Sequence, residues 1–318
     1  MDDFTAAKSA LFRFAGTLLA FGTIFYVSSV ERSQPNGAIR NGTSRADGRS
    51  PATPYATLAA ALSSTSNPEL EAGDTIILMP GHVETVATAN GVDITTANIR
   101  ILGAGRGANR PQVNFTATDA TFRVNANGVE IENIQFTGGI DAVVLCIDVN
   151  GKTDVAFRNC SYRDVTGQCT VFFKAANNSD RLIMEGWRYL GDAAAGTTAA
   201  FRFDGCDDLH MTDFEIVGNF GTSAIQFLTT ASARIRIDGG PTRSFIWNQN
   251  AADVCIVDTV TGSTGNITGD LYLRVTDNAA NITEAITGAT FSVFDNVWVC
   301  NAVNEKAMLI NWTASTDA

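Results

Sequence analysis

The stretch "GVEIENIQF" (128–136) is the first of four similar segments in this chain of 318 residues. The others are "DVAFRNCSY" (154–162), "RLIMEGWRY" (181–189) and "DLHMTDFEI" (208–216), at offsets of 26, 27 and 27 residues. Each segment holds two pairs of apolar residues, and within each pair the apolar residues are separated by one position, as in a half-buried strand. A repeat of this length is typical of an architecture built from stacked, similar units.

The apolar positions of these segments fall into four columns that we expect to face the interior. The columns are Val129, Val155, Leu182 and Leu209; Ile131, Phe157, Met184 and Met211; Ile134, Cys160, Trp187 and Phe214; and Phe136, Tyr162, Tyr189 and Ile216. Between the second and third columns stand Asn133, Asn159, Gly186 and Asp213. These residue types tolerate the left-handed backbone of a sharp corner. Each segment therefore predicts two short strands joined by a corner.

A further short strand precedes each segment, as "LCIDVN" (145–150) precedes the second. Two or three strands with their corners, in about 25 residues, match one coil of a parallel β-helix. Stacked coils pair their strands in parallel, bury the inward columns and expose strand edges only at the two ends. We predict an all-β fold in which residues 70–300 form roughly eight or nine coils.

The chain divides into four predicted parts. We expect an N-terminal docking arm at 1–23, then a first strand, loop and short capping helix at 24–69. A parallel β-helix follows at 70–240, and a divergent β end or cap at 241–318. Oligomerisation is one function that this last part could have. The helix is predicted from the apolar spacing in "PYATLAAALSS" (54–64). It is placed so that it can cover the open end of the first coil.

The N-terminal arm is rich in large apolar residues. They are Phe4, Leu11, Phe12, Phe14, Leu18, Leu19 and Phe21. The run "ALFRFAGTLLAFGTIFYV" (10–27) is apolar enough for a signal peptide or a membrane span, and the signal peptide stays open as an alternative. The acidic start, Arg13 and the lack of a small-residue cleavage site favour an arm that leads into a first strand, "TIFYVSS". We expect this arm to dock on a larger assembly.

Composition restricts the partners that the chain can have. The formal net charge is −11 at pH 7, which repels nucleic acid and anionic lipid, so neither a nucleic acid nor a membrane is expected as a partner. The six cysteines, at positions 146, 160, 169, 206, 255 and 300, form no CxxC pair. A zinc site is therefore disfavoured, whereas disulfides and buried free thiols both stay open. No cofactor is expected.

Three stretches near the N-terminus carry a resemblance to a known group. "YATLAAAL", "GDTIILMPGHVET" and "NIRILGAGRG" look like the opening of the right-handed parallel β-helix, or pectin-lyase-like, proteins. The resemblance covers about residues 24–240 and implies the fold. The group includes polysaccharide lyases, glycosidases, tailspikes and inert virion proteins, so the resemblance leaves the activity open.

The resemblance implies that an enzyme of this kind would act along the outer face of the helix. The repeat alignment places Glu132, Arg158, Glu185, Arg188 and Glu215 on outward columns, where they could form one charged patch. Glu185 and Glu215 are the best candidate pair of catalytic carboxylates, with Arg158 and Arg188 beside them. A glycosidase needs its two carboxylates about 5–10 Å apart. The favoured interpretation is instead an exposed ladder of ion pairs between coils.

Two other groups of residues are weaker candidates for chemistry. Asp204, Asp207 and Asp208 in "FDGCDD" could bind calcium, but they lack the ligand spacing of a calcium loop. A solvated turn is the favoured interpretation, and no metal is expected. His82 and His210 are the only histidines and lie far apart in the sequence. His82 follows a Pro-Gly pair and is predicted to be a turn residue rather than a catalyst.

The preferred functional hypothesis is a non-enzymatic bacteriophage virion protein exposed on the particle surface. Capsid decoration (a cement protein) is the first placement, and a head or tail spike is the second. The expected partners are other virion proteins, which the arm would contact, and further copies of the chain, for which family analogy suggests a trimer. In one alternative the chain also binds a host surface polysaccharide. The other hypotheses are a polysaccharide lyase or glycosidase of the tailspike depolymerase type, and a secreted, extracellular bacterial adhesin with residues 10–27 as its signal.

Overall fold

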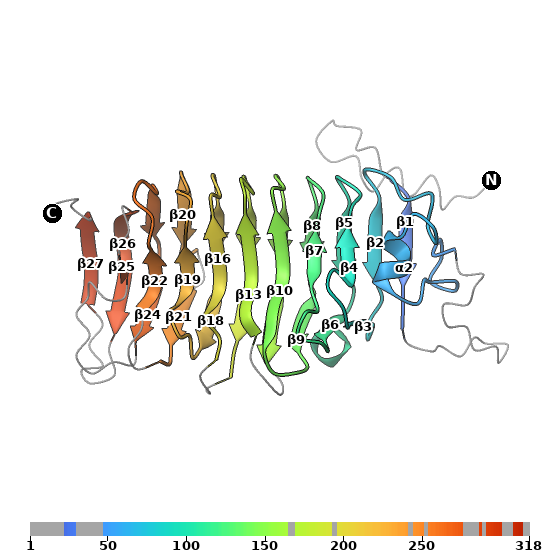
Figure 1. The fold of residues 1–318 in the computed structure, drawn as a ribbon, viewed down its shortest axis with the longest axis horizontal. Helices are drawn as coiled ribbons and strands as arrows, with labels where there is room; N and C mark the ends of the chain where they lie inside the picture. Colours follow the sequence, from blue (N-terminus) through green and yellow to red (C-terminus); the bar gives the residue numbers. More distant parts are fainter. Residues whose placement is uncertain are drawn as a thin grey trace.

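The repeated segments form short strands that stack in parallel along one long axis (Figure 1). The computed structural model describes residues 22–29, 47–164, 169–192, 196–240, 244–250, 254–275, 286–287, 291–300 and 308–313. Over these residues the chain is an all-β parallel β-helix, with only two short helical segments, α2 (Leu58–Leu62) and η1 (Gly107–Asn109).

Each coil passes in turn through three stacks of strands. The first stack is β1 (Ile24–Val27), β2 (Thr75–Leu78), β5 (Arg100–Gly103), β8 (Glu130–Glu132), β11 (Ala156–Arg158), β14 (Ile183–Glu185), β17 (His210–Thr212), β20 (Ile235–Asp238), β23 (Gly265–Thr268) and β26 (Phe291–Cys300). The second is β3 (Val83–Val86), β6 (Gln112–Phe115), β9 (Gln135–Gly138), β12 (Ser161–Asp164), β15 (Arg188–Leu190), β18 (Glu215–Gly218), β21 (Ser244–Asn248) and β24 (Leu271–Val275). The third is β4 (Val92–Ile94), β7 (Phe122–Val124), β10 (Val143–Asn150), β13 (Cys169–Ala176), β16 (Ala199–Asp204), β19 (Ser223–Phe227), β22 (Val254–Asp258) and β25 (Ile286–Thr287).

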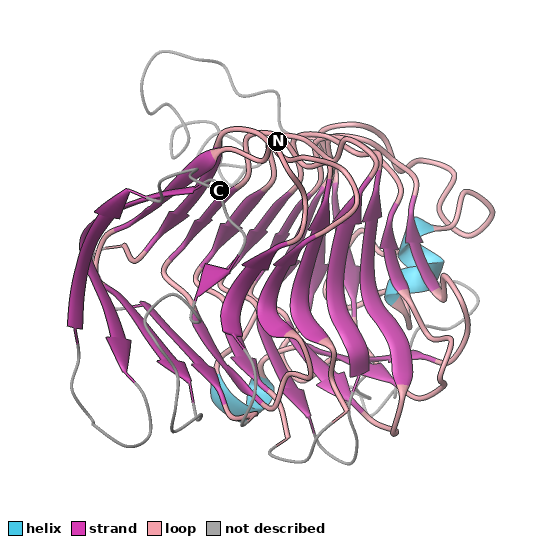
Figure 2. Ribbon diagram, turned by 60° about the vertical axis from the view of Figure 1, so that its left-hand side comes forward, coloured by secondary structure: helices cyan, strands magenta, loops and turns pink. Residues whose placement is uncertain are grey.

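The number of coils is close to the predicted one. The third stack has eight strands in one sheet, which delimit seven full turns, against the roughly eight or nine coils expected from the repeat length. The strands of the first and second stacks continue past residue 240 through β21, β23, β24 and β26. Among the described strands, only β27 (Met308–Thr313) pairs in the antiparallel sense, with β26 at the C-terminal end. Figure 2 shows the stacked strands wrapped around a common interior.

The four predicted apolar columns form the core. All of their sixteen side chains are at most 2% exposed. Trp187 lies at the centre of an aromatic cluster, with its ring centroid 5.8 Å from that of Phe157 and 5.6 Å from that of Phe201. The alternation of apolar and polar residues along each strand therefore sets which side chains enter the interior.

The predicted corner residues adopt the left-handed backbone that the turn requires. Asn133, Asn159, Gly186 and Asp213 have φ values of 57°, 50°, 69° and 54°. The side-chain N–H of Asn133 donates to the carbonyl oxygen of Gly103 on the neighbouring coil, at 2.6 Å. Each corner is thus stabilised by its own residue type and, at Asn133, by a hydrogen bond to the preceding coil.

The predicted N-terminal strand and capping helix are both present. β1 pairs with β2 in parallel, and α2 packs against β1 and β4, the first strand of the third stack (Figure 1). The helix begins at an N-cap, Thr57, whose side chain accepts a hydrogen bond from the Ala60 N–H at 3.1 Å. The helix therefore covers the apolar interior at this end of the third stack.

Residues 1–21 of the predicted docking arm, with all of its large apolar residues, lie outside the described residues, which begin at residue 22. Within the part of the chain that the structure describes, no helix is long and apolar enough to cross a membrane.

The cysteines are free thiols, which answers a question that the sequence left open. Five of the six are buried and Cys300 is half-buried. Burial raises the pKa of Cys160, Cys206 and Cys255 to about 12, so these thiols are protonated and unreactive near neutral pH. They act as small apolar groups in the core.

Candidate functional site

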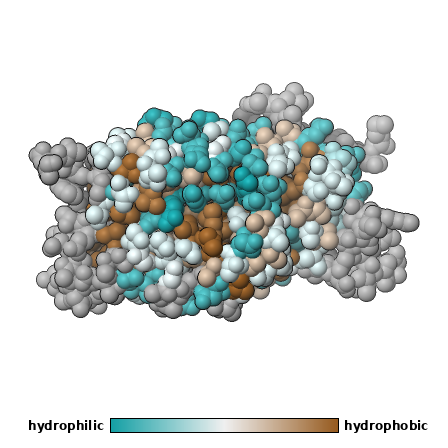
Figure 3. Space-filling view, in the orientation of Figure 1, coloured by the Kyte–Doolittle hydropathy of each residue, from teal (hydrophilic) through white to brown (hydrophobic). Residues whose placement is uncertain are grey.

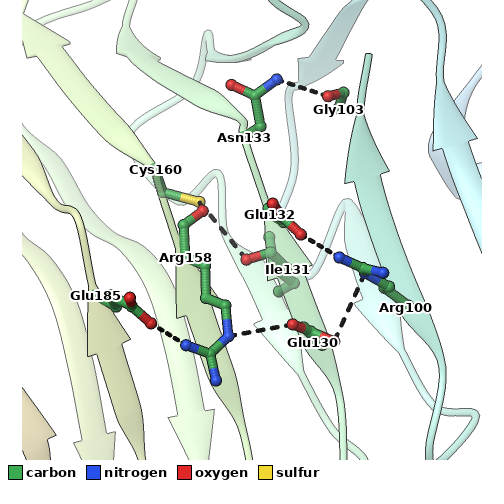
Figure 4. Close-up of polar contacts among 9 residues, drawn as sticks. All are labelled: Arg100, Gly103, Glu130, Ile131, Glu132, Asn133, Arg158, Cys160 and Glu185. Carbon is green, nitrogen blue, oxygen red and sulfur yellow. Dashed lines mark hydrogen bonds and ion pairs between the residues drawn. The ribbon is translucent and has the colours of Figure 1, made fainter. Parts of the chain in front are cut away.

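The outward face of the first stack carries a ladder of ion pairs, which we call the arginine–glutamate ladder (Arg100, Glu130, Glu132, Arg158 and Glu185; Figure 4). Arg158 on β11 contacts Glu130 on the preceding coil, with 3.2 Å between Nε and Oε1, and also pairs with Glu185 on the following coil. Arg100 on β5 pairs with both Glu130 and Glu132. The charges alternate along the stack, so each coil neutralises its neighbours.

The ladder is only partly shielded from water. Its side chains are between 23% and 46% exposed, with Glu132 the least and Glu185 the most exposed. Each carboxylate of the ladder already has an arginine partner. The geometry agrees with the ion-pair interpretation of these outward columns.

The candidate catalytic pair lies on two different coils. Glu185 is on β14, in the first stack, and Glu215 is on β18, in the second stack of the next coil. Across the coils, Glu185 lies beside Thr212, whereas Glu215 lies beside Arg188. Glu215 and Arg188 form a separate, highly exposed pair, with 3.9 Å between Nη1 and Oε2. The predicted single patch is therefore two groups of ion pairs, one on each side of a corner.

Replacing Arg158 by alanine tests the structural role of the ladder. We expect Arg158→Ala to lower the free energy of unfolding by less than about 1 kcal/mol, because partly exposed ion pairs lose most of their attraction to solvent screening. The loss should shrink further in about 1 M salt, where the screening length is roughly 3 Å. Denaturation midpoints at low and high salt measure both effects, with Arg188→Ala as the matched exposed control. A loss of several kcal/mol that persists in high salt would contradict the interpretation of the ladder as partly exposed, solvent-screened ion pairs.

The three aspartates proposed as a weak calcium site serve turns and ion pairs. Asp204 accepts a hydrogen bond from the Thr230 N–H at 2.9 Å, and Asp207 accepts one from the Ala233 N–H at 2.8 Å. Asp208 forms a two-pronged pair with Arg234, which lowers the pKa of its carboxyl group. Among the described residues, no group of three or more histidine, cysteine or acidic side chains could hold a metal ion.

A different set of carboxylates, which sequence analysis missed, gathers where the second stack ends. Asp164 terminates β12, and its Oδ1 accepts a hydrogen bond from the Tyr162 hydroxyl at 2.9 Å. The pKa of Asp164 is raised to about 6, chiefly by burial. The hydrogen bonds from Tyr162 and from the backbone of Asp192 act to lower this pKa, and the neighbouring carboxylates Asp192 and Asp141 act to raise it. One carboxyl group is thus protonated under conditions in which exposed carboxylates are ionised.

The sequence contains a signal for this set. Asp164 is the last residue of β12, and Asp141 and Asp192 lie three and two residues beyond the ends of β9 and β15, in three successive coils. The repeat offsets of 26 and 27 residues do not align them with one another, but each lies within three residues of the end of its strand. The repeat comparison ended at Phe136, Tyr162 and their equivalents, so it stopped just before these residues.

The raised pKa of Asp164 predicts how stability depends on pH. The pKa in the folded chain lies above the ordinary 3.8 of an aspartate, so the folded state holds this proton more tightly than the unfolded state. The stabilisation is complete below about pH 4 and is lost as the pH rises through about 6.

Asp164→Asn should remove this dependence. We expect the variant to melt at a higher temperature than the wild type at about pH 8 and at nearly the same temperature at about pH 4. Thermal melts across this range measure the difference. A difference that does not change with pH would show that the ionisation of Asp164 does not limit stability.

The two histidines lie in unlike surroundings. His210 sits on the outward face of β17 beside Arg236 on the next coil, and burial together with this arginine lowers its pKa. His82 is completely buried between β2 and β3 and is hydrogen-bonded through both ring nitrogens. Neither is placed beside a hydroxyl or thiol nucleophile in any hydrogen bond among the described residues, so neither resembles an activating base.

Comparison of the chain with protein-family models, with curated proteins and with solved structures gave no match. The fold is therefore assigned from strand register and burial alone.

Proposed function

We propose that this chain is a non-enzymatic structural protein of a bacteriophage virion, exposed on the particle surface. Capsid decoration is the preferred placement, and a head or tail spike is the second. The proposal takes the chain as a relative of the pectin-lyase-like β-helices that serve as inert virion proteins. Its partners would be other virion proteins, met through the N-terminal arm, and further copies of the same chain, with a trimer as the working assumption.

One observation carries this proposal. The charged residues on the outward face of the first stack are used in ion pairs between coils: Arg158 alone joins β8, β11 and β14 through Glu130 and Glu185. An outer face whose charges are taken up in ion pairs between coils suits a scaffold more than a catalyst, which needs carboxylates free to act on a substrate.

The character of the surface is compatible with exposure in an assembly. Figure 3 shows hydrophilic side chains gathered in a band across one face, with hydrophobic side chains beside it. Large apolar side chains that are more than a third exposed include Val144 and Leu190. They are single residues on different stacks, as on the surface of an ordinary folded protein.

The location of the chain in a phage particle tests the proposal. Particles purified from the phage that encodes the chain are analysed by mass spectrometry for its copy number and by electron microscopy with antibodies against it. Many copies spread over the shell support decoration, whereas labelling confined to a tail or a vertex supports a spike. Absence of the chain from purified particles would overturn the proposal.

A second candidate, a polysaccharide-cleaving enzyme, is favoured by the carboxylates at Asp141, Asp164 and Asp192. A carboxyl group with a pKa of about 6 can act as a general acid near neutral pH, and glycosidase chemistry needs a second carboxyl group nearby as base or nucleophile. This site replaces the pair Glu185 and Glu215 as the place where we would first look for glycosidase chemistry.

The enzyme candidate is tested with purified protein and a panel of acidic and capsular polysaccharides, by measuring new reducing ends and unsaturated products. Activity that is lost in Asp164→Asn and kept in Asp154→Asn, an exposed aspartate paired with Arg181, would establish this candidate and remove the non-enzymatic one. Activity lost in Glu185→Gln instead would move the site to the arginine–glutamate ladder. No product from any substrate would favour the scaffold.

A further inference from the structure

The outward face of the second stack changes character halfway along the β-helix. On β6, β9 and β12 the outward positions hold glutamine, asparagine, threonine, serine and arginine. From β15 to β26 most of them hold large apolar side chains, which we call the apolar field (Leu190, Val217, Phe245, Trp247, Tyr272 and Trp298). The side chains that alternate with them point inward and fill the interior, so the core does not require the field.

Strand register makes the apolar field continuous. One row crosses β15, β18 and β21 from Leu190 to Trp247, and the next row crosses β21, β24 and β26 from Phe245 to Trp298. The rings of Tyr272 and Trp298 are nearly parallel, with their centroids 5.9 Å apart. Leu190 is 51% exposed and the other members are half-buried, so the field as a whole is partly open to solvent.

The residue types of the field are those of a protein interface. Contiguous apolar side chains on a surface commonly mark a contact with another molecule, and Trp, Tyr, Phe and Arg are enriched where proteins meet. The field lies on the outward face of a sheet, whereas small ligands are held in concave sites. The guanidinium of Arg274 covers one face of the Trp247 ring, 4.3 Å from its centroid, which leaves less of that ring for a stacked sugar. The field therefore suits a protein partner.

The charges around the field favour an acidic partner. Along the described strands of the second stack, the outward positions carry three arginines, Arg163, Arg188 and Arg274, and one acidic residue, Glu215. This face is therefore positive on a chain whose formal net charge is −11. Opposite charges on two surfaces speed their association and disfavour wrong contacts. A second copy of the chain supplies the acidic surface.

We propose that the apolar field is a self-association surface, which docks against an acidic part of a second copy of this chain. Two fields do not face each other in this contact, because their arginines would repel. A contact between unlike surfaces repeats from copy to copy and closes into a ring when the rotation permits. The inference deepens the contact between copies that is part of the proposed function, because it names the surface.

Analytical ultracentrifugation of the full chain tests the proposal. We expect the wild type, with a chain mass of 33.7 kDa, to sediment as an oligomer. Leu190→Glu places a negative charge on the most exposed member of the field and should raise the dissociation constant by at least about tenfold. Val144→Glu is the matched control, since Val144 is a 61% exposed valine on the third stack, and it should associate like the wild type.

A second variant covers the case in which Leu190→Glu does not fold. The side chain of Arg188 is 78% exposed, so Arg188→Glu leaves the core intact and should also weaken the association. Circular dichroism melts of each variant check that the fold is kept. The wild-type association should weaken between about 0.05 and 0.5 M salt, because salt screens the attraction between the two surfaces.

A wild type that stays monomeric at about 100 μM would overturn the proposal, whether the field then binds a sugar or another protein. Equal dissociation constants for the wild type, Leu190→Glu and Arg188→Glu would also overturn it, as would equal weakening in Leu190→Glu and Val144→Glu. A monomeric chain that is found on purified phage particles would refute this inference and leave the virion function standing. Self-association of a chain that is absent from the particles would do the reverse.

Discussion

Trp187→Ala is expected to lower the free energy of unfolding by about 4 kcal/mol, the largest loss that we predict for one substitution. The indole ring is fully buried and contacts the rings of Phe136, Phe157, Phe172 and Phe201. Neighbouring coils are held apart at the strand spacing by their hydrogen bonds, so they cannot collapse into the space left by the ring. The substitution therefore leaves a cavity as well as removing apolar contact.

Chemical denaturation followed by circular dichroism measures this loss, and Trp247→Ala is the matched control. Trp247 is half-buried on the outward face of β21, where the guanidinium of Arg274 lies 4.3 Å from its ring centroid. We expect its removal to cost only about 1 kcal/mol. Equal losses in the two variants would show that the aromatic cluster does not dominate the core.

Trp187→Phe refines the same prediction. The indole Nε1 is buried and has no hydrogen-bond partner among the described residues. Phenylalanine keeps most of the apolar contact and removes this unpaired donor, so part of the cost of the smaller ring is offset. We expect a loss well below that of Trp187→Ala.

Gly103→Ala is expected to lower the free energy of unfolding by about 3 kcal/mol, because a methyl group at this position meets the backbone of the next coil. A Cβ on Gly103 would lie 2.9 Å from the carbonyl carbon of Asn133 and closer still to its oxygen. Backbone atoms cannot rotate away as a flexible side chain can. The clash would push β5 from β8 and weaken the hydrogen bond from Asn133 to Gly103.

Gly221→Ala is the matched control for this prediction. Its Cβ would meet only the carbonyl oxygen of Thr197, at 3.7 Å, which is ordinary contact. We expect a change within about 0.5 kcal/mol of zero, since the restricted unfolded chain offsets small strain. The unfolding midpoints of both variants decide the matter: similar midpoints would mean that the coils can separate locally without cost.

The sequence repeat predicts the coil because the spacing of its apolar and corner residues is set within each repeat of about 27 residues. Residues such as Ile131 and Phe157 alternate with polar neighbours, and Asn133 and Asn159 occupy the corner between the two strands. An apolar column at constant offset allows only one register in which all of its members are buried. The register of Glu130 beside Ala156 and of Glu132 beside Arg158 follows from this constraint.

The candidate site could not be predicted in the same way. The outward columns identify which charged residues share a face, but side-chain contacts decide that Arg158 joins Glu130 and Glu185, while Glu215 turns to Arg188 beyond a corner. The raised pKa of Asp164 depends on burial at a strand end. Desolvation of this kind depends on the path of the surrounding loops, which no repeat specifies.

The sequence by itself determined the all-β class, the parallel stacking of coils, the inward columns and the corner residues, because each depends on spacing within a repeat. Only the tertiary structure decided the role of His82, which the sequence predicted to be a turn residue. Its hydrogen bonds reach Ser29, 53 residues away, and join it to Glu84, which binds the capping helix. These contacts join segments that are far apart in the sequence and outside the repeats. They form only after the chain has closed its first coil, so the repeat pattern does not predict them.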